Sequence, residues 1–126
     1  MVKSTTLMMA VLATVVGSAF GGYSDNCHGS SRCNKGMGPA CRSAYARFTD
    51  GTVYNAYVSR TFGHCTAIYR CNSGYPALTG AQLKGFFAPI FAGQGCQGCG
   101  SHAFDGGNCE VTVNYCSNCV DSGNPN

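Results

Sequence analysis

The spacing of apolar residues along the chain predicts two amphipathic helices. Between positions 39 and 49, apolar side chains recur three and four residues apart, which places them on one helical face. Pro39 suits the first turn of this helix, and Asp50-Gly51 ends it. A second helix is expected after Thr79, a residue type that caps helices, and Pro89 should kink or shorten it. The apolar faces comprise Cys41, Ala44, Tyr45 and Phe48 in the first helix and Leu83, Phe86, Phe87, Ile90 and Phe91 in the second.

Alternation of side chains with a period of two predicts two strands, over 64–72 and 111–115. The stretch 53–59 is rich in β-forming residues but alternates imperfectly, so a strand and an extended loop both remain open. The order helix, strand, helix, strand predicts an α+β fold, with an antiparallel or mixed sheet and two helices packed on one face. The shared strand faces are Ala67, Tyr69 and Cys71, opposite Ile68 and Arg70, and then Val111, Val113 and Tyr115.

The beginning of the chain has the features of a secretory signal peptide. Lys3 precedes an apolar run over 7–16, and Gly17-Ser18-Ala19 forms a cleavage site of small residues. We therefore expect a signal peptide over 1–19 and a single domain over 20–126, with cleavage after Gly22 as the alternative. An uncleaved membrane anchor is disfavoured because the apolar run is too short to span a bilayer. The mature protein is expected to be secreted and extracellular.

Ten cysteines, an even number, predict a framework of five disulfides in an oxidising compartment. Two pairs, Cys96-x-x-Cys99 and Cys116-x-x-Cys119, also fit the spacing of a zinc ribbon. Zinc needs free thiolates, however, and the secretory route oxidises them. A redox-active pair is disfavoured because neither motif lies in a thioredoxin-like βαβ pattern. We expect no metal and no cofactor.

Charge and candidate catalytic groups exclude several function classes. Without Lys3 the chain carries seven Lys and Arg against five Asp and Glu, so its net charge is only +2. This balance supports neither nucleic acid nor an anionic membrane as a partner, and a monomer is expected. His28, His64 and His102 are scattered, and Glu110 is the only glutamate. No paired carboxylates or nucleophile with a base stand out, so we expect no enzymatic activity.

Motifs at both ends of the predicted domain carry a resemblance to a known family. Asn26-Cys27-x-Gly29-Ser30-Ser31-x-Cys33, Gly95-Cys96-x-x-Cys99-Gly100-Ser101 and Val111-Thr112-Val113-Asn114-Tyr115 resemble the KP-four killer toxin family, first known as virus-encoded toxins of smut fungi. The resemblance implies a disulfide-rich α/β sandwich with an antiparallel sheet and two helices. It also implies a secreted antifungal or effector protein that stops the growth of target cells by blocking calcium channels. The partner would be a membrane channel or another cell-surface target.

The resemblance also implies particular residues. Toxicity in that family is associated with basic groups on the sheet side, where this chain offers Arg60 and Arg70. A basic group could plug a channel mouth that is ringed by carboxylates. Taken singly, each arginine is more often an ordinary solvated surface residue.

Three disulfides follow from the resemblance by position: Cys27–Cys96, Cys33–Cys99 and Cys65–Cys119. The other four cysteines depart from the family pattern, so their pairing is inferred from strand and helix faces. Cys109 shares a face with Val111, toward the helices, and Cys41 lies on the buried stripe of the first helix. This favours Cys41–Cys109 and Cys71–Cys116, with a local Cys109–Cys116 bridge as the alternative.

The tyrosines support a second functional hypothesis, a secreted module that binds cell-wall carbohydrate without toxicity. Aromatic rings can stack on sugars, although most tyrosines serve in core and rim packing. The seven candidates are Tyr23, Tyr45, Tyr54, Tyr57, Tyr69, Tyr75 and Tyr115.

Overall fold

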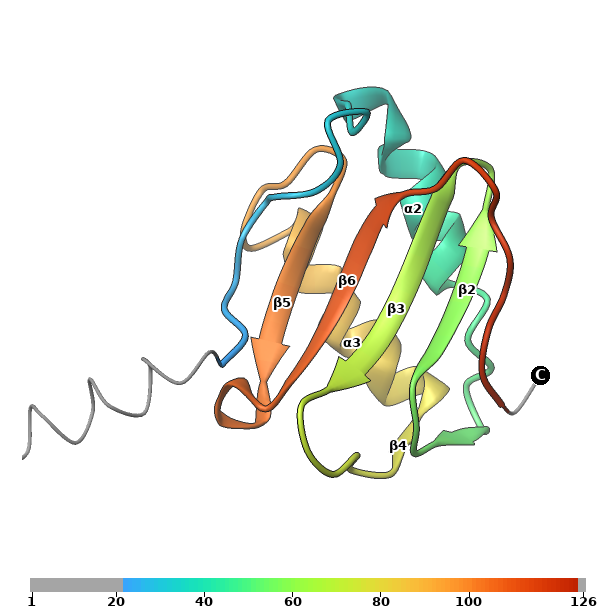
Figure 1. The fold of residues 1–126 in the computed structure, drawn as a ribbon, viewed down its shortest axis with the longest axis vertical. Coiled ribbons are helices and arrows are strands. Elements are labelled where there is room, and N and C mark those ends of the chain that lie inside the picture. Colours follow the sequence, from blue (N-terminus) through green and yellow to red (C-terminus); the bar gives the residue numbers. More distant parts are fainter. Residues whose placement is uncertain (1–21, 125–126) are drawn as a thin grey trace, which may run out of the picture.

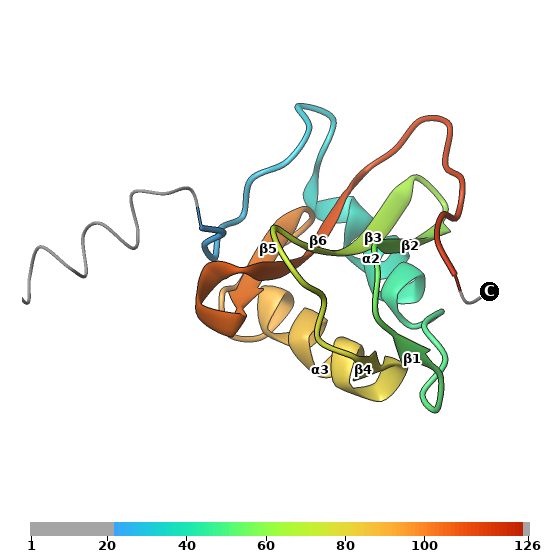
Figure 2. The ribbon, with the colours of Figure 1, turned by 60° about the horizontal axis from the view of Figure 1, so that its bottom comes forward.

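The computed structural model of the chain describes residues 22–124. The expected signal peptide and the cleavage site after Ala19 lie outside the described residues. The described part forms two layers, a four-stranded antiparallel sheet and two helices that cross one of its faces (Figures 1 and 2). The expected α+β fold, with two helices on one face of an antiparallel sheet, is confirmed. Within residues 22–124, no helix has the length and apolar character needed to cross a membrane.

The large sheet has the strand order β2-β3-β6-β5, and every neighbouring pair is antiparallel. A small second sheet pairs β1 with β4. The strands are β1 (Val53–Tyr54), β2 (Val58–Phe62), β3 (Cys65–Cys71), β4 (Leu78–Thr79), β5 (Gly100–Phe104) and β6 (Cys109–Tyr115). The helices are the short η1 (Lys35–Met37) and η2 (Asp105–Gly107), and the α-helices α2 (Gly38–Tyr45) and α3 (Gly80–Phe91).

The predicted strands 64–72 and 111–115 correspond to β3 and β6, and the ambiguous stretch 53–59 contains β1 and the start of β2. The edge strand β5 was not expected, because its sequence GSHAF lacks alternation and follows a glycine-rich stretch. Its first residue must be glycine. A Cβ at Gly100 would lie 2.7 Å from Cys96 Sγ and 2.9 Å from the Asn26 carbonyl oxygen.

Thr79 caps α3, as expected, and does so in a reciprocal capping box. The Gln82 amide donates to Thr79 Oγ1 at 3.1 Å, and the Thr79 amide donates to Gln82 Oε1 at 2.9 Å. The helix runs on through Pro89 to Phe91, so the expected shortening is wrong. Pro89 removes only the bond to the Gly85 carbonyl, and Gly85 is exposed to water, which can satisfy that group.

The core lies between the helices and the inner face of the sheet. Alternation sends Ala67 and Tyr69 of β3 toward this layer, together with Val111 and Val113 of β6, and all four are fully buried. The Tyr69 hydroxyl donates to the Pro76 carbonyl at 2.8 Å, and burial raises the pKa of Tyr69 to about 12. The helices contribute Cys41, Ala44, Leu83, Phe87 and Ile90, all of them fully buried.

All ten cysteines lie within residues 22–124, and all are paired. Five disulfides place the folded protein in an oxidising environment. Two pairs that the resemblance implied are present, Cys27–Cys96 and Cys33–Cys99, and both tie the N-terminal segment to the loop before β5. The remaining bridges are Cys41–Cys65, Cys71–Cys109 and Cys116–Cys119.

The expected bridges Cys65–Cys119, Cys41–Cys109 and Cys71–Cys116 therefore do not form, and the sheet register explains why. Cys71 and Cys109 are directly opposite each other in β3 and β6, so they pair across the strands. Cys65 faces inward at the other end of β3, where α2 places Cys41. Cys116 lies beyond the end of β6 and closes a turn with Cys119.

Candidate functional site

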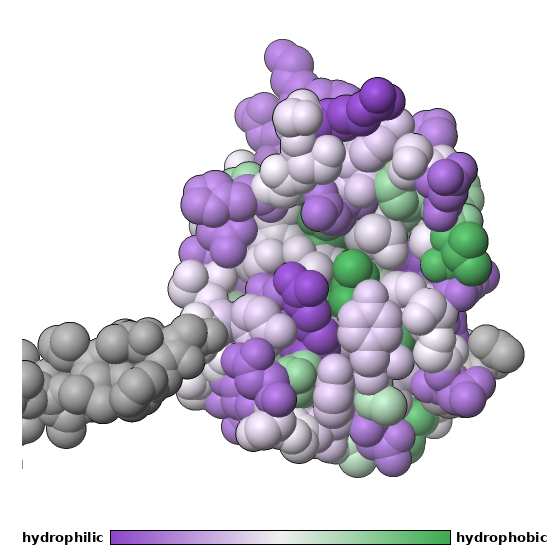
Figure 3. Space-filling view, in the orientation of Figure 1, coloured by the Kyte–Doolittle hydropathy of each residue, from purple (hydrophilic) through white to green (hydrophobic). Residues whose placement is uncertain are grey.

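The outer face of the sheet is open and mainly polar. Figure 3 shows this face with hydrophilic side chains over β3, β5 and β6 and a few hydrophobic ones between them. Because side chains alternate along each strand, the outward residues are the sequence neighbours of the inward ones described above. They are Ser59 and Thr61 of β2, Thr66, Ile68 and Arg70 of β3, Ser101 and Ala103 of β5, and Glu110, Thr112 and Asn114 of β6.

The N-terminal segment 22–34 forms a wall beside this open face, above the layer of strands (Figure 2). Its backbone pairs with β5 through two bonds between Asn26 and Ser101, at 2.8 and 3.1 Å. Farther along, the Ser30 amide donates to Asn114 Oδ1 at 2.9 Å. A cleft of about 380 Å³ lies between wall and sheet. Its lining comprises Gly22, Tyr23, Ser24, Asn26, His28, Gly29, Arg70, Ser101, Glu110, Thr112 and Asn114.

Gly29 allows the wall to approach the sheet closely. A Cβ at this position would lie 2.5 Å from Cys99 Cβ and 2.9 Å from Asn114 Oδ1, distances that real Cβ atoms do not reach. Any side chain here would push the segment away from β6. Close packing of the wall against β6 therefore explains the glycine in the sequence motif Cys27-x-Gly29.

An ion pair forms the floor of the cleft. Arg70 Nε and Nη2 each donate to Glu110 Oε2 at 2.7 Å. Glu110 is 3% exposed, whereas the Arg70 side chain is 44% exposed. Burial opposes the charged form of Arg70, but the hydrogen bond and negative charge of Glu110 outweigh it, so the pKa of Arg70 is raised. Among residues 22–124, Glu110 Oε1 has no hydrogen-bond partner, so one acceptor remains available at the floor.

Two tyrosines flank Arg70. Its guanidinium carbon lies 5.5 Å from the centre of the Tyr23 ring. Tyr57, which is 43% exposed, directly precedes β2 and lies beside Arg70 because Val58 pairs with Tyr69. The other five tyrosines serve in packing. Tyr54 and Tyr69 are buried in the core, Tyr45 stacks on Phe87, Tyr75 meets Tyr69 edge to face, and Tyr115 stacks on His64.

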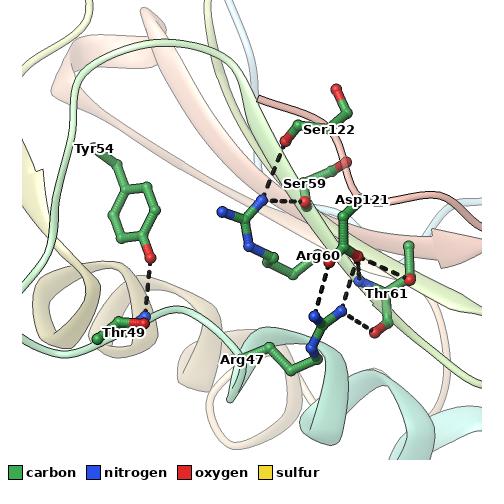
Figure 4. Close-up of polar contacts among 8 residues, drawn as sticks. All are labelled: Arg47, Thr49, Tyr54, Ser59, Arg60, Thr61, Asp121 and Ser122. Atoms are coloured by element: carbon green, nitrogen blue, oxygen red, sulfur yellow. Dashed lines mark hydrogen bonds and ion pairs between the residues drawn. The ribbon is translucent and has the colours of Figure 1, made fainter. Parts of the chain in front are cut away.

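Arg60 and Arg70 were expected together on the exposed side of the sheet, but Arg60 does not lie at the surface. It pairs with Ala67, so it faces the helices and is only 3% exposed. Its Nη1 donates to the Ser59 and Ser122 carbonyls at 2.8 and 3.2 Å, as Figure 4 shows. Its guanidinium also lies 5.9 Å from the Phe48 ring centre. The expected two-arginine surface is therefore reduced to Arg70, and Arg60 holds the C-terminal segment to β2.

The three histidines are not brought together. His28 lines the cleft, His64 stacks on Tyr115, and His102 Nδ1 lies 3.1 Å from Asp25 Oδ1. Within the described part of the chain, no group of three or more His, Cys, Asp or Glu side chains is arranged to hold a metal ion. The sequence shows these polar and aromatic residues one by one, but it does not show that the fold brings them together around one cleft.

A family model described as MU117, the meiotically up-regulated gene family, matches residues 25–119. The expected membership in the KP-four killer toxin family is therefore wrong. Two of the three motifs that carried that resemblance consist largely of cysteines and glycines, which report a disulfide framework more than a particular surface. No curated protein matches the chain.

Proposed function

We propose a function for this chain, which belongs to the meiotically up-regulated gene family: it is a secreted protein that binds cell-wall carbohydrate. The ligand would be a neutral oligosaccharide of the chitin or glucan type, held in the cleft on the open face of the sheet. One observation carries this proposal. The cleft joins an ion-paired polar floor to the Tyr23 ring, and the exposed Tyr57 lies near Arg70 just outside the lining.

The chemistry of the floor suits hydroxyl groups. Glu110 Oε1 is an unused acceptor, and Asn114 Nδ2 and Arg70 Nη1 have no hydrogen-bond partner among residues 22–124. Adjacent donors and acceptors match neighbouring sugar hydroxyls, each of which both donates and accepts. Because Arg70 and Glu110 neutralise each other, neither an anionic nor a cationic ligand is favoured.

The tyrosine rings add an apolar surface at the edge of this polar floor. The Tyr23 ring packs against Arg70 and Tyr57 lies near the same guanidinium, so both rings can cover the C–H faces of sugar units. A ligand that is polar along its edges and apolar on its faces fits such an arrangement, and carbohydrates have this character.

Disulfides pre-form the cleft. Cys27–Cys96 and Cys33–Cys99 fix the wall segment at its middle and near its C-terminal end, and Cys71–Cys109 locks β3 to β6 beside the floor. A site that is ordered before the ligand arrives loses little conformational entropy on binding. Such rigidity supports binding by a protein whose core is small.

Binding is favoured over hydrolysis because Glu110 is the one carboxylate among the lining residues of the cleft. Glycoside hydrolysis generally uses a pair of carboxyl groups on either side of the scissile bond. Glu110 Oε2 is also occupied by the ion pair with Arg70.

Growth inhibition of target cells by calcium-channel block stays a prediction. Its two supports were the family resemblance, which is corrected above, and a pair of surface arginines, of which Arg70 alone is at the surface. The carbohydrate proposal rests instead on the geometry of the cleft.

A glycan array, followed by calorimetric titration with soluble chitin and glucan oligosaccharides, tests the proposal. We expect one class to bind and the Tyr57→Ala variant to bind it roughly tenfold more weakly, the loss of one aromatic contact. Phe62→Ala is the matched control, because Phe62 is also exposed but lies at the far end of β2. Absence of binding to every glycan, or equal loss in both variants, would overturn the proposal.

A further inference from the structure

One disulfide differs from the other four in both span and burial. Cys116–Cys119 joins residues only three apart, whereas the other bridges span 24 to 69 residues. Each of the other bridges has at least one cysteine that is buried, but Cys116 and Cys119 are both partly exposed. Cys27 is exposed as well, but its partner Cys96 is buried, so Cys116–Cys119 is the bridge in which neither cysteine is buried.

The fold does not depend on this bridge. A disulfide stabilises a protein mainly by closing a loop in the unfolded chain, and the stabilisation grows with the length of that loop. The loop between Cys116 and Cys119 is the shortest of the five, so this bridge stabilises the fold least. The strand β6 ends at Tyr115, and the segment after Cys119 is held separately, through two backbone bonds between Ser59 and Ser122. Opening the bridge leaves these contacts in place.

The bridge borders a hollow of about 540 Å³ with a basic wall. Its lining comprises Ser30, Arg32, Tyr115, Cys116, Ser117 and Asn118. The guanidinium of Arg32 lies 5.6 Å from the Tyr115 ring centre, and His64 Nδ1 lies 3.1 Å from the Cys116 carbonyl oxygen. None of these lining residues is acidic. A nearby cation favours the thiolate form of cysteine, and a Cys-x-x-Cys spacing does so as well.

We propose that Cys116–Cys119 is a thiol–disulfide exchange site that accepts a dithiol through this hollow. A thiolate of the dithiol attacks Cys116 Sγ, the S–S bond breaks, and Cys119 leaves as a thiolate. The second thiol of the partner then attacks the mixed disulfide and releases Cys116. The partner gains an intramolecular disulfide and is oxidised by two electrons, and the two protein thiolates take up the two protons that the partner lost.

Graded reduction of the native, fully oxidised protein with dithiothreitol, followed by alkylation and peptide mapping, tests the proposal. We expect the first species to carry two alkyl groups, on Cys116 and Cys119, with the other four bridges intact. The Cys116→Ser/Cys119→Ser variant should fold and should lack this first step. Earlier reduction of another bridge, simultaneous loss of all five, or failure of the variant to fold would overturn the proposal.

The rate of thiol–disulfide exchange tests whether Arg32, the basic residue of the hollow, assists the reaction. Arg32→Gln should slow the first step roughly threefold or more near neutral pH, because the hollow loses the cation that attracts the attacking thiolate toward Cys116. Lys35→Gln is the matched control, since Lys35 is an exposed cation close in sequence that does not line the hollow. Equal rates for both variants would contradict the role of Arg32 and leave the hollow without a chemical function.

Discussion

The same strands form both faces of the four-stranded sheet, but the side chains on the two faces differ in polarity. On the inner face, Tyr69, Val111 and Val113 are fully buried beneath the helices. On the outer face, Arg70, Glu110 and Asn114 line a cleft between the sheet and the N-terminal segment. The inner residues are constrained by packing, so they specify the fold. The outer residues are mostly polar and several of them line the cleft, which supports the proposed role in recognition.

Arg60 and Arg70 show how strictly the register separates the faces. The two residues have the same chemistry and belong to neighbouring strands. Arg60 pairs with Ala67 and faces the core, whereas Arg70 pairs with Glu110 and faces the cleft. The comparison predicts that substitutions on the inner face change stability and that substitutions on the outer face change binding.

The largest effect is expected for Phe87→Ala on the inner side. Phe87 is fully buried and stacks against Tyr45 and Phe48, with ring centres 5.1 and 5.7 Å away. Its removal should lower the free energy of unfolding by about 3–5 kcal/mol, through lost burial and the cavity left behind. Urea denaturation measures this change. A loss below about 1 kcal/mol would mean that the helices do not pack on the sheet as described.

A smaller loss, about 2 kcal/mol, is expected for Arg60→Ala. The substitution removes packing on Phe48 and two bonds to backbone carbonyls, one of which holds the C-terminal segment. Carbohydrate binding per folded molecule should stay unchanged, because Arg60 is on the inner face. Weakened binding by a folded Arg60→Ala protein would break the separation of the two faces.

Arg70→Gln should cost about 1–2 kcal/mol, because it leaves the buried Glu110 carboxylate without its charged partner. The partly exposed position of Arg70 moderates this cost. Adding Glu110→Gln should restore most of the lost stability, since the two amides can bond to each other. Thermal unfolding of the single and double variants measures the coupling. Additive losses in this cycle would show that the two side chains do not interact.

The smallest effect concerns pH and the C-terminal segment. Burial of Asp121 opposes its charged form, but hydrogen bonds from Arg47 and Thr61 outweigh this and lower its pKa (Figure 4). The carboxylate therefore stabilises the fold above the unfolded carboxyl pKa of about 3.9, and this contribution disappears as pH falls through the lower folded value. Asp121→Asn should cost less than about 1 kcal/mol at pH 7 and a smaller amount at pH 2. An equal cost at both pH values would contradict the ion pair.

Features governed by local periodicity were predictable from the sequence. The faces of β3 and β6 and the apolar stripe of α3 follow from spacing, and the Thr79 cap follows from its residue type. The first helix was expected over 39–49 but ends at Tyr45, so Phe48 of its predicted stripe lies in the turn after the helix. The pairing of Cys41, Cys65, Cys71 and Cys109 depends on which strands are neighbours and on their register, which periodicity does not encode. The face of Arg60 was missed for a related reason, because the alternation of 53–59 is imperfect.

The cleft itself could not be predicted because it is made by segments far apart in the chain. Its wall comes from residues 22–34, and its floor comes from β3 and β6. The wall has no regular secondary structure of its own and is placed by two disulfides and by pairing with the unexpected strand β5. Tyr23 and Tyr57 therefore could not be separated from the five packing tyrosines.

Mapping the bound oligosaccharide by amide and side-chain chemical shifts in solution tests the central claim most directly, that the outer face recognises carbohydrate. The titration should perturb Tyr23, Gly29, Glu110 and the Asn114 side-chain amide, and it should leave the residues of α2 and α3 unchanged. Phe62, exposed outside the cleft, provides the internal reference. Perturbations confined to the helices, or spread evenly over the surface, would contradict the assignment of recognition to the open face.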